Sequence, residues 1–95
     1  MSEERLTTIY FIDDGTYIKI GRSNNLEQRR ETLQVANPNA LTILYTLPNI
    51  PYCMEPHIHG ICNRFHVSGE WFKKEVIGHL MAIPYYKEHL LPFIL

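Results

Sequence analysis

The chain has 95 residues, of which 45% are hydrophobic and 20% are charged, and its formal net charge at pH 7 is −1. This length suits a single domain, and this composition excludes an intrinsically disordered chain, which needs low hydrophobicity and high net charge. The near-neutral balance also excludes a generally basic nucleic-acid binder, so any affinity for phosphate must come from a local group of cations.

The start of the chain predicts a β-hairpin. Residues 6–12 and 16–20 are rich in β-branched and aromatic side chains, as strands are, and Asp13-Asp14-Gly15 between them is typical of a turn. A two-residue turn at Asp14-Gly15 would place Tyr10 opposite Lys19 on one face of the sheet. A three-residue loop would turn Lys19 to the other face, and we favour the first register.

A helix and a third strand are expected after the hairpin. Residues 23–33 offer polar caps, an acid in the first turn, and apolar side chains at Leu26 and Leu33, which predicts a short amphipathic helix. The segment Asn37-Pro38-Asn39 ends that helix. Apolar and polar side chains alternate in residues 41–47, which predicts a third strand.

The next segment predicts a second helix, over about residues 55–62. Pro56 has no N–H and is tolerated only in a first turn, so this helix should begin near Tyr52 or Cys53. Residues 63–69 are expected to form a loop.

Two further elements are expected before the C-terminal tail. Glu70-Trp71-Phe72 is expected to be a short edge strand, with Trp71 and Phe72 filling the core. A third helix follows, and its apolar face is formed by Val76, Ile77, Leu80 and Met81.

The tail, residues 84–95, is unusually apolar for a chain end. It should either cover its own domain, which we place at residues 1–83, or contact a second subunit. Because so many large apolar side chains exceed what a small core needs, we expect a homodimer whose contact includes the tail.

We expect no membrane partner and an intracellular location. The longest apolar runs, such as residues 9–12, are far shorter than the roughly 18 to 20 residues that cross a bilayer. The acidic residues near Met1 do not fit the charged start of a signal peptide. Cys53 and Cys62 are therefore expected to be reduced, in a protein that is cytoplasmic, nucleoid-associated or viral in a host cell.

Five short motifs, in order along the chain, resemble the GIY-YIG nuclease superfamily. They are Thr8-Ile9-Tyr10, Tyr17-Ile18-Lys19-Ile20-Gly21, Arg29, Glu55 with His59, and Gly69-Glu70-Trp71-Phe72. The branch that they resemble most is that of the phage T5 Orf172 and Mug113-like domains. The similarity covers roughly residues 6 to 80. Thr8 and Lys19 stand where the superfamily has its name-giving glycine and tyrosine.

The resemblance implies an α/β (α+β) fold in which helices flank a small three-stranded antiparallel sheet. It also implies an endonuclease that hydrolyses DNA phosphodiester bonds with one Mg²⁺ or Mn²⁺ ion. The residues carried over are Tyr10, Lys19, Arg29 and His59 as catalytic groups and Glu55 as the metal ligand. Because the Orf172 branch is also described as DNA-binding, a catalytically weak DNA-binding module on the same fold is the alternative.

These residue types suit that chemistry. Phosphodiester hydrolysis needs a base for the attacking water, a cation for the charge that develops on phosphate, and a carboxylate for the metal. Tyr10, Arg29 and Glu55 supply one of each. Lys19 would either hold a phosphate or, beside Tyr10, lower the pKa of the phenol. Taken without the resemblance, Tyr10 is a half-buried core aromatic and Glu55 a first-turn acid.

Two basic stretches would give the DNA-binding surface. Residues 15–30 carry an excess of positive charge, as do residues 64–74, and a fold that joins them would create one positive face. The predicted DNA-binding residues are Arg22, Arg30, Arg64, Lys73 and Lys74.

A zinc site is the rival interpretation of the second helix region. Cys53 with His57, and Cys62 with His66, have the i, i+4 spacing of metal ligands on a helix, and His59 lies between them. Zinc bound there would indicate a metal-stabilised binding module.

Overall fold

The computed structural model describes residues 5–94, and within them one antiparallel sheet carries four α-helices. The sheet has six strands in the order β4-β5-β2-β1-β3-β6. The strands are β1 (Leu6–Asp13), β2 (Tyr17–Ser23), β3 (Thr42–Pro51), β4 (His66–Ser68), β5 (Trp71–Lys73) and β6 (Leu91–Pro92). The helices are α1 (Leu26–Val35), α2 (Met54–Ile61), α3 (Glu75–Met81) and α4 (Pro84–His89), with a 3₁₀ turn at Asn63–Phe65.

The expectation of a three-stranded sheet is wrong. The three long strands are those predicted, but the supposed loop at residues 63–69 contains β4, and the tail contributes β6. β5 is not an edge strand, because it lies between β2 and β4. Strands of two or three residues are too short to show an alternation of apolar and polar side chains, so the sequence does not predict them. They form because they pair with a neighbouring strand.

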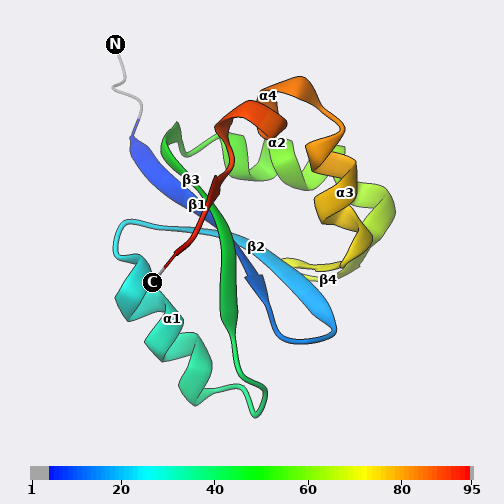
Figure 1. Ribbon diagram of the computed structural model, residues 1–95. Coiled ribbons are helices and arrows are strands. Elements are labelled where there is room, and N and C mark those ends of the chain that lie inside the picture. Colours follow the sequence, from blue (N-terminus) through cyan, green and yellow to red (C-terminus); the bar gives the residue numbers. More distant parts are fainter. Residues whose placement is uncertain (1–4, 95) are drawn as a thin grey trace.

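The sheet has two unequal hydrophobic faces. Ile9 and Phe11 of β1 project into the larger core, which α2, α3 and α4 cover. Tyr10 and Ile12 project to the other face, where Leu26 and Leu33 of α1 pack against them as predicted. Figure 1 shows this division, with α2, α3 and α4 gathered on one side of the sheet and α1 on the other.

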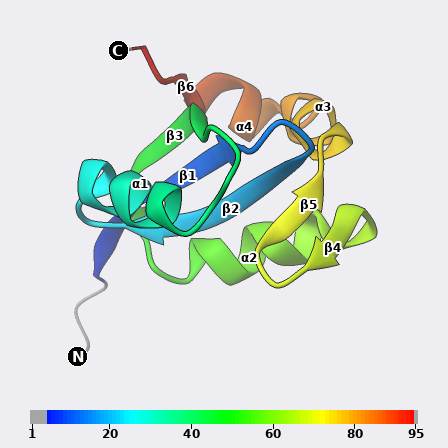
Figure 2. The ribbon, with the colours of Figure 1, turned by 90° about the horizontal axis from the view of Figure 1, so that it is seen from below.

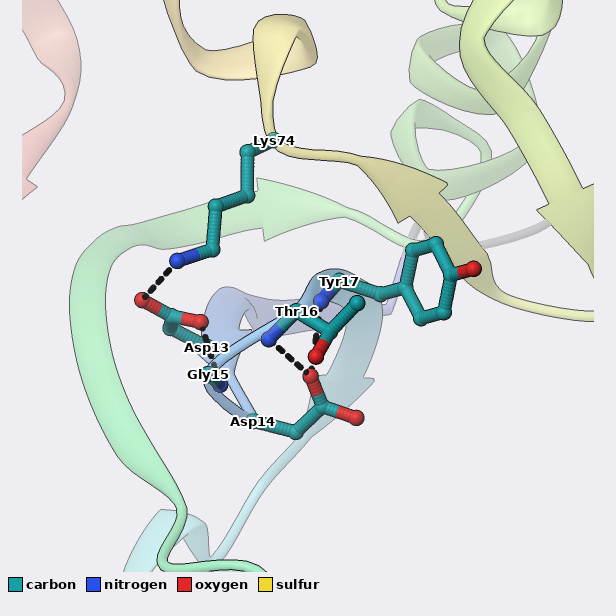
Figure 3. Close-up of polar contacts among 6 residues, drawn as sticks. All are labelled: Asp13, Asp14, Gly15, Thr16, Tyr17 and Lys74. Atoms are coloured by element: carbon teal, nitrogen blue, oxygen red, sulfur yellow. Dashed lines mark hydrogen bonds and ion pairs between the residues drawn. The ribbon is translucent and has the colours of Figure 1, made fainter.

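The hairpin turn is centred on Gly15-Thr16, so neither predicted register is correct. The N–H of Asp14 donates to the carbonyl of Tyr17 at 3.1 Å, and Gly15 has a φ of +100°, which suits a turn with glycine at its first central position. The Asp14 carboxylate accepts from the N–H groups of Thr16 and Tyr17, as Figure 3 shows. These contacts select a turn that is shifted by one residue from Asp14-Gly15.

The shifted turn moves every β1–β2 pair but preserves the faces. Tyr10 lies opposite Gly21, and Lys19 lies opposite Ile12. Tyr10 and Lys19 therefore share one face of the sheet, as the favoured register predicted, although they are diagonal neighbours and not direct partners.

Local signals place both helices that border the candidate site. The side chain of Asn25 accepts from the N–H of Gln28 and caps α1, which fixes where that helix begins. α2 begins at Met54, so Pro56 falls within its first turn, as predicted. None of the helices within residues 5–94 is long and apolar enough to cross a membrane.

Much of the apolar tail packs on its own domain. Tyr86 of α4 and Leu90 are buried in the larger core, and β6 pairs with β3. Tyr85, Leu91 and Ile94 remain exposed, and Leu95 lies outside the described residues. The domain therefore covers Tyr86 and Leu90 but does not cover all the apolar side chains of the tail.

Candidate active site

Tyr10 is held on the central strand directly over a glycine. Its ring crosses Gly21 on β2 so closely that a Cβ atom at that position would lie 2.6 Å from the Tyr10 Cζ atom. The residue is only 1% exposed. Position 21 therefore requires a glycine, because the Tyr10 ring fills the space that a side chain would need. The presence of Gly21 in its motif is thus explained by the presence of Tyr10 in another.

The environment of Tyr10 favours the neutral phenol. Burial, followed by the negative charges of Glu70 and Glu55, raises the pKa of Tyr10 to about 12, although the nearby Arg29 guanidinium acts in the opposite direction. The expectation that Lys19 lowers this pKa is wrong. The Lys19 ammonium pairs instead with Glu70, 3.1 Å from its Oε1 atom.

α2 brings Glu55 and His59 to the edge of β2. β5 pairs with β2 only as far as Lys19, and beyond that point α2 contacts the strand. The His59 Nε2–H donates to the Ile20 carbonyl at 2.9 Å. Figure 2 shows β5 and β4 beside β2, with α2 near the same edge. Because the His59 Nε2 atom carries the proton that is donated to Ile20, the unprotonated nitrogen of the neutral His59 ring is Nδ1.

Glu55, His59 and Glu70 form a cluster of potential metal ligands. One ligand atom from each lies within 4.8 Å of those of the other two. The Oε2 atom of Glu55 is buried and has no hydrogen-bond partner within residues 5–94. A buried carboxylate oxygen without a donor is costly and needs an explanation, which a proton or a cation would provide.

The cluster shifts the protonation of Glu55. Burial is the main cause that raises the pKa of Glu55, followed by the negative charge of Glu70. His59 and Arg22 partly offset this rise. Glu70 was not among the predicted catalytic or metal-binding residues, although its place in the Gly-Glu-Trp-Phe motif was the signal that could have identified it.

The two neighbouring arginines of α1 face different parts of the molecule. Arg29 lines a hollow of about 430 Å³ together with Ser23, Asn25, Gln28 and Thr32. Its charge acts on Tyr10. Arg30 lines a separate hollow with Leu41, Thr42, Ile43 and Phe93. The structure thus brings Arg29 to the tyrosine site and turns Arg30, a predicted DNA-binding residue, toward β3 and the tail.

The β2–β5 pairing joins the two basic stretches, but acids neutralise part of that surface. Arg22 lies 4.0 Å from Glu55 and over the Tyr52 ring, with 4.3 Å to the ring centre. Lys74 pairs with Asp13 at 3.7 Å, as Figure 3 shows. The other two predicted DNA-binding residues, Arg64 and Lys73, are exposed. The expected positive face is therefore mixed in sign.

The zinc interpretation has no support in this geometry. Across residues 5–94, the only group of three His, Cys, Asp or Glu residues with converging ligand atoms is the Glu55, His59 and Glu70 cluster. Cys53 is exposed, and Cys62 is fully buried in the larger core. The helical spacing of the cysteines and histidines therefore does not assemble a site.

Comparison with known proteins agrees with the motif reading. No curated protein and no solved structure matches the chain. A family model described as the T5orf172 domain matches residues 7–83, which include β1 through α3 and all the site residues described above. The T5orf172 domain suggests a nuclease-like or DNA-binding module. The chain belongs to the T5orf172 domain family.

Proposed function

We propose that this protein is a Mg²⁺-dependent endonuclease that hydrolyses phosphodiester bonds in DNA. The observation that carries the proposal is the buried, unpartnered Oε2 atom of Glu55 beside Glu70 and His59. Tyr10 lies within electrostatic reach of Glu70 and Glu55 of this cluster, and also of Arg29. The proton acceptor of the proposal, Tyr10, is thus near both a carboxylate pair and a cation that can bind phosphate.

The donor set fits a hard divalent cation. Mg²⁺ prefers carboxylate oxygens, and Glu55 and Glu70 would hold it, with His59 fixing the position of the helix that carries Glu55. When bound, Mg²⁺ supplies positive charge to the phosphate oxygens and lowers the pKa of coordinated water. Two carboxylates, Glu55 and Glu70, gather negative charge at this site. The ammonium of Lys19, which lies beside Glu70, offsets part of that charge.

The protein groups have separable roles in this proposal. Arg29 donates hydrogen bonds from its planar fork to the phosphate and stabilises the charge that develops there. Tyr10 accepts the proton of the attacking water. Because the pKa of Tyr10 is about 12, the phenolate is scarce at neutral pH, and Arg29 is the group that favours it.

Plasmid cleavage tests the proposal with a control built into the helix. The protein should cut DNA with Mg²⁺ or Mn²⁺ and not with EDTA. Arg29→Ala should lose about 10²- to 10³-fold in rate, the usual effect of removing one donor to a transition state. Arg30→Ala removes the same charge from the adjacent position and should change the rate much less, because Arg30 faces a different hollow. Equal activity of the two variants would remove Arg29 from the mechanism.

A DNA-binding module without efficient catalysis is the second candidate. The observation in its favour is the near-complete burial of Tyr10 together with its raised pKa, both of which disfavour a reactive phenolate. Wild-type protein that binds DNA in a gel-shift assay but never cuts it with any divalent metal would establish this alternative.

A further inference from the structure

A groove beside the candidate site is lined by two aromatic rings. It has a volume of about 390 Å³ and lies between the loop that joins α1 to β3, residues 36–39, and the β4–β5 hairpin. Tyr17 of β2, Trp71 of β5 and Val67 of β4 contribute to its walls. Figure 3 shows the Tyr17 ring extending away from Asp14 and Lys74.

These aromatic side chains are not needed to fill the core. Phe72 is fully buried, as expected, but its neighbour Trp71 is only partly buried and Tyr17 is 38% exposed. Tyr17 lies opposite Lys73, and Trp71 lies opposite Lys19, in the β2–β5 ladder. All four therefore share the face of the sheet on which Tyr10 also lies.

Lys19 connects the groove with the candidate site. Its ammonium is 5.3 Å from the centre of the Trp71 ring and 3.1 Å from Glu70, a member of the carboxylate cluster. A ligand held on Trp71 would thus be only one side chain away from the groups that act on phosphate. Lys73, exposed on the same face, adds a second cation near the aromatic pair.

We propose that this groove binds an unpaired nucleobase of the DNA strand that the candidate site cleaves. This inference rests on the proposed function and names its substrate class as DNA with a single-stranded segment at the cleavage point. Every base has a π-face that can stack on Tyr17 or Trp71, and the exposed Lys73 suits a neighbouring phosphate. In a duplex the base faces are already stacked, so a base can enter the groove only when it is unpaired.

The charge of the groove supports a neutral base in its interior. Asp14 lines the end next to Tyr17, and its carboxylate accepts from the N–H groups of Thr16 and Tyr17 at 2.8 and 2.7 Å. A phosphate there would be repelled. Asn37 and Asn39 also line the groove, and amide side chains can exchange hydrogen bonds with base edges.

The chain carries its own reporter for this contact, because Trp71 is its only tryptophan. Titration with a short oligothymidylate in EDTA, where cleavage cannot occur, should quench the tryptophan fluorescence. A blunt duplex of the same length should quench it less and bind more weakly. An oligonucleotide of the same charge made of abasic sites should bind weakly and leave the emission unchanged.

Tyr17→Ala provides a second test, which removes an exposed ring and leaves the buried core unchanged. The Tyr17 ring is exposed, and its loss should weaken oligothymidylate binding by roughly 5- to 150-fold, which corresponds to about 1 to 3 kcal/mol for one aromatic stacking partner. Tyr85→Ala is the matched control, since Tyr85 is 41% exposed on α4 and lies outside the groove. It should leave the affinity unchanged.

The outcomes separate this inference from the proposed function. If the protein cleaves DNA but prefers duplex, or if Tyr17→Ala and Tyr85→Ala bind oligothymidylate equally, the groove assignment is overturned while the nuclease stands. If oligothymidylate quenches Trp71 and Tyr17→Ala weakens its binding, but no metal supports cleavage, the base-binding groove stands and the nuclease proposal fails.

Discussion

Replacing Glu55 by glutamine should stabilise this protein while it removes cleavage. The amide keeps the size of the side chain but removes a buried charge that Glu70 repels. With ligand atoms up to 4.8 Å apart, two like charges repel by about 3.5 kcal/mol at an effective dielectric constant of 20 and by about 1 kcal/mol in water. Losing the attraction of Arg22, an exposed partner 4.0 Å away, costs about 1 kcal/mol at most. We expect a net gain on the order of 1 kcal/mol at neutral pH, or about 4 to 8 °C in Tm.

The pH dependence of this gain has a definite sign. Folding raises the pKa of the Glu55 carboxyl above its ordinary value of 4.5. The free energy of unfolding of the wild type is therefore highest while this carboxyl is protonated, and it falls as the pH rises through the pKa of the folded state. The variant has no such group. Urea unfolding in EDTA should therefore give equal free energies of unfolding below pH 4.5 and an advantage for the variant at neutral pH. Glu88→Gln, an exposed acid on α4, should change stability little at either pH.

Adding Mg²⁺ should reverse the order of the two proteins. A cation that binds only the folded state raises the free energy of unfolding of the wild type, and the variant should gain less because it lacks the charged ligand. DNA binding should persist in the variant. The reasoning would be refuted if Glu55→Gln were less stable than the wild type in EDTA at neutral pH, or if both proteins responded equally to Mg²⁺.

Three further expectations concern the tyrosine, the glycine beneath it and the tail. In plasmid assays at alkaline pH, the cleavage rate should rise about tenfold per pH unit as long as the pH is below the Tyr10 pKa of about 12. Tyr10→Phe should abolish both cleavage and this dependence on pH. Gly21→Ala should cost about 1 to 3 kcal/mol in urea unfolding and displace Tyr10. In contrast, Gly78→Ala, whose Cβ meets nothing within 4 Å in the described part of the chain, should not destabilise. The exposed Leu91 and Ile94 predict a homodimer by light scattering; a monomeric intact protein, or a Leu91→Glu variant that stays dimeric, would contradict the tail contact.

The sequence predicted the structure well where a local pattern allows only one conformation, such as a proline in the first turn of a helix. Pro56 fixed the start of α2 to within a turn. The favoured two-residue turn placed Tyr10 and Lys19 on the correct common face, although its register differs from the observed one. The prediction failed on the exact turn, because the choice between Asp14-Gly15 and Gly15-Thr16 depends on which N–H groups the Asp14 carboxylate accepts from. That competition leaves no periodic trace in the sequence.

The candidate site was predictable only in part for a similar reason. Tyr10, Arg29 and Glu55 could be found from motifs in order along the chain. The partner of Lys19 could not, because Glu70 reaches it through the β2–β5 pairing, which brings together residues more than fifty positions apart. The pKa of Tyr10 was predicted with the wrong sign, since burial and the charge of Glu70 outweigh the Arg29 guanidinium.

The lengths of the strands also bear on how the molecule avoids joining others of its kind. The outer strands, β4 with three residues and β6 with two, expose very little unpaired backbone to a foreign strand, and β6 includes Pro92, which has no N–H to donate. The long strand β1, which holds Tyr10, is enclosed between β2 and β3. Edge-to-edge growth onto β4 or β6 is thereby discouraged, although β6 pairs with only Tyr45 and Thr46 of the longer β3. The apolar central strand β1 is itself unavailable as a template for aggregation, because both of its edges are paired.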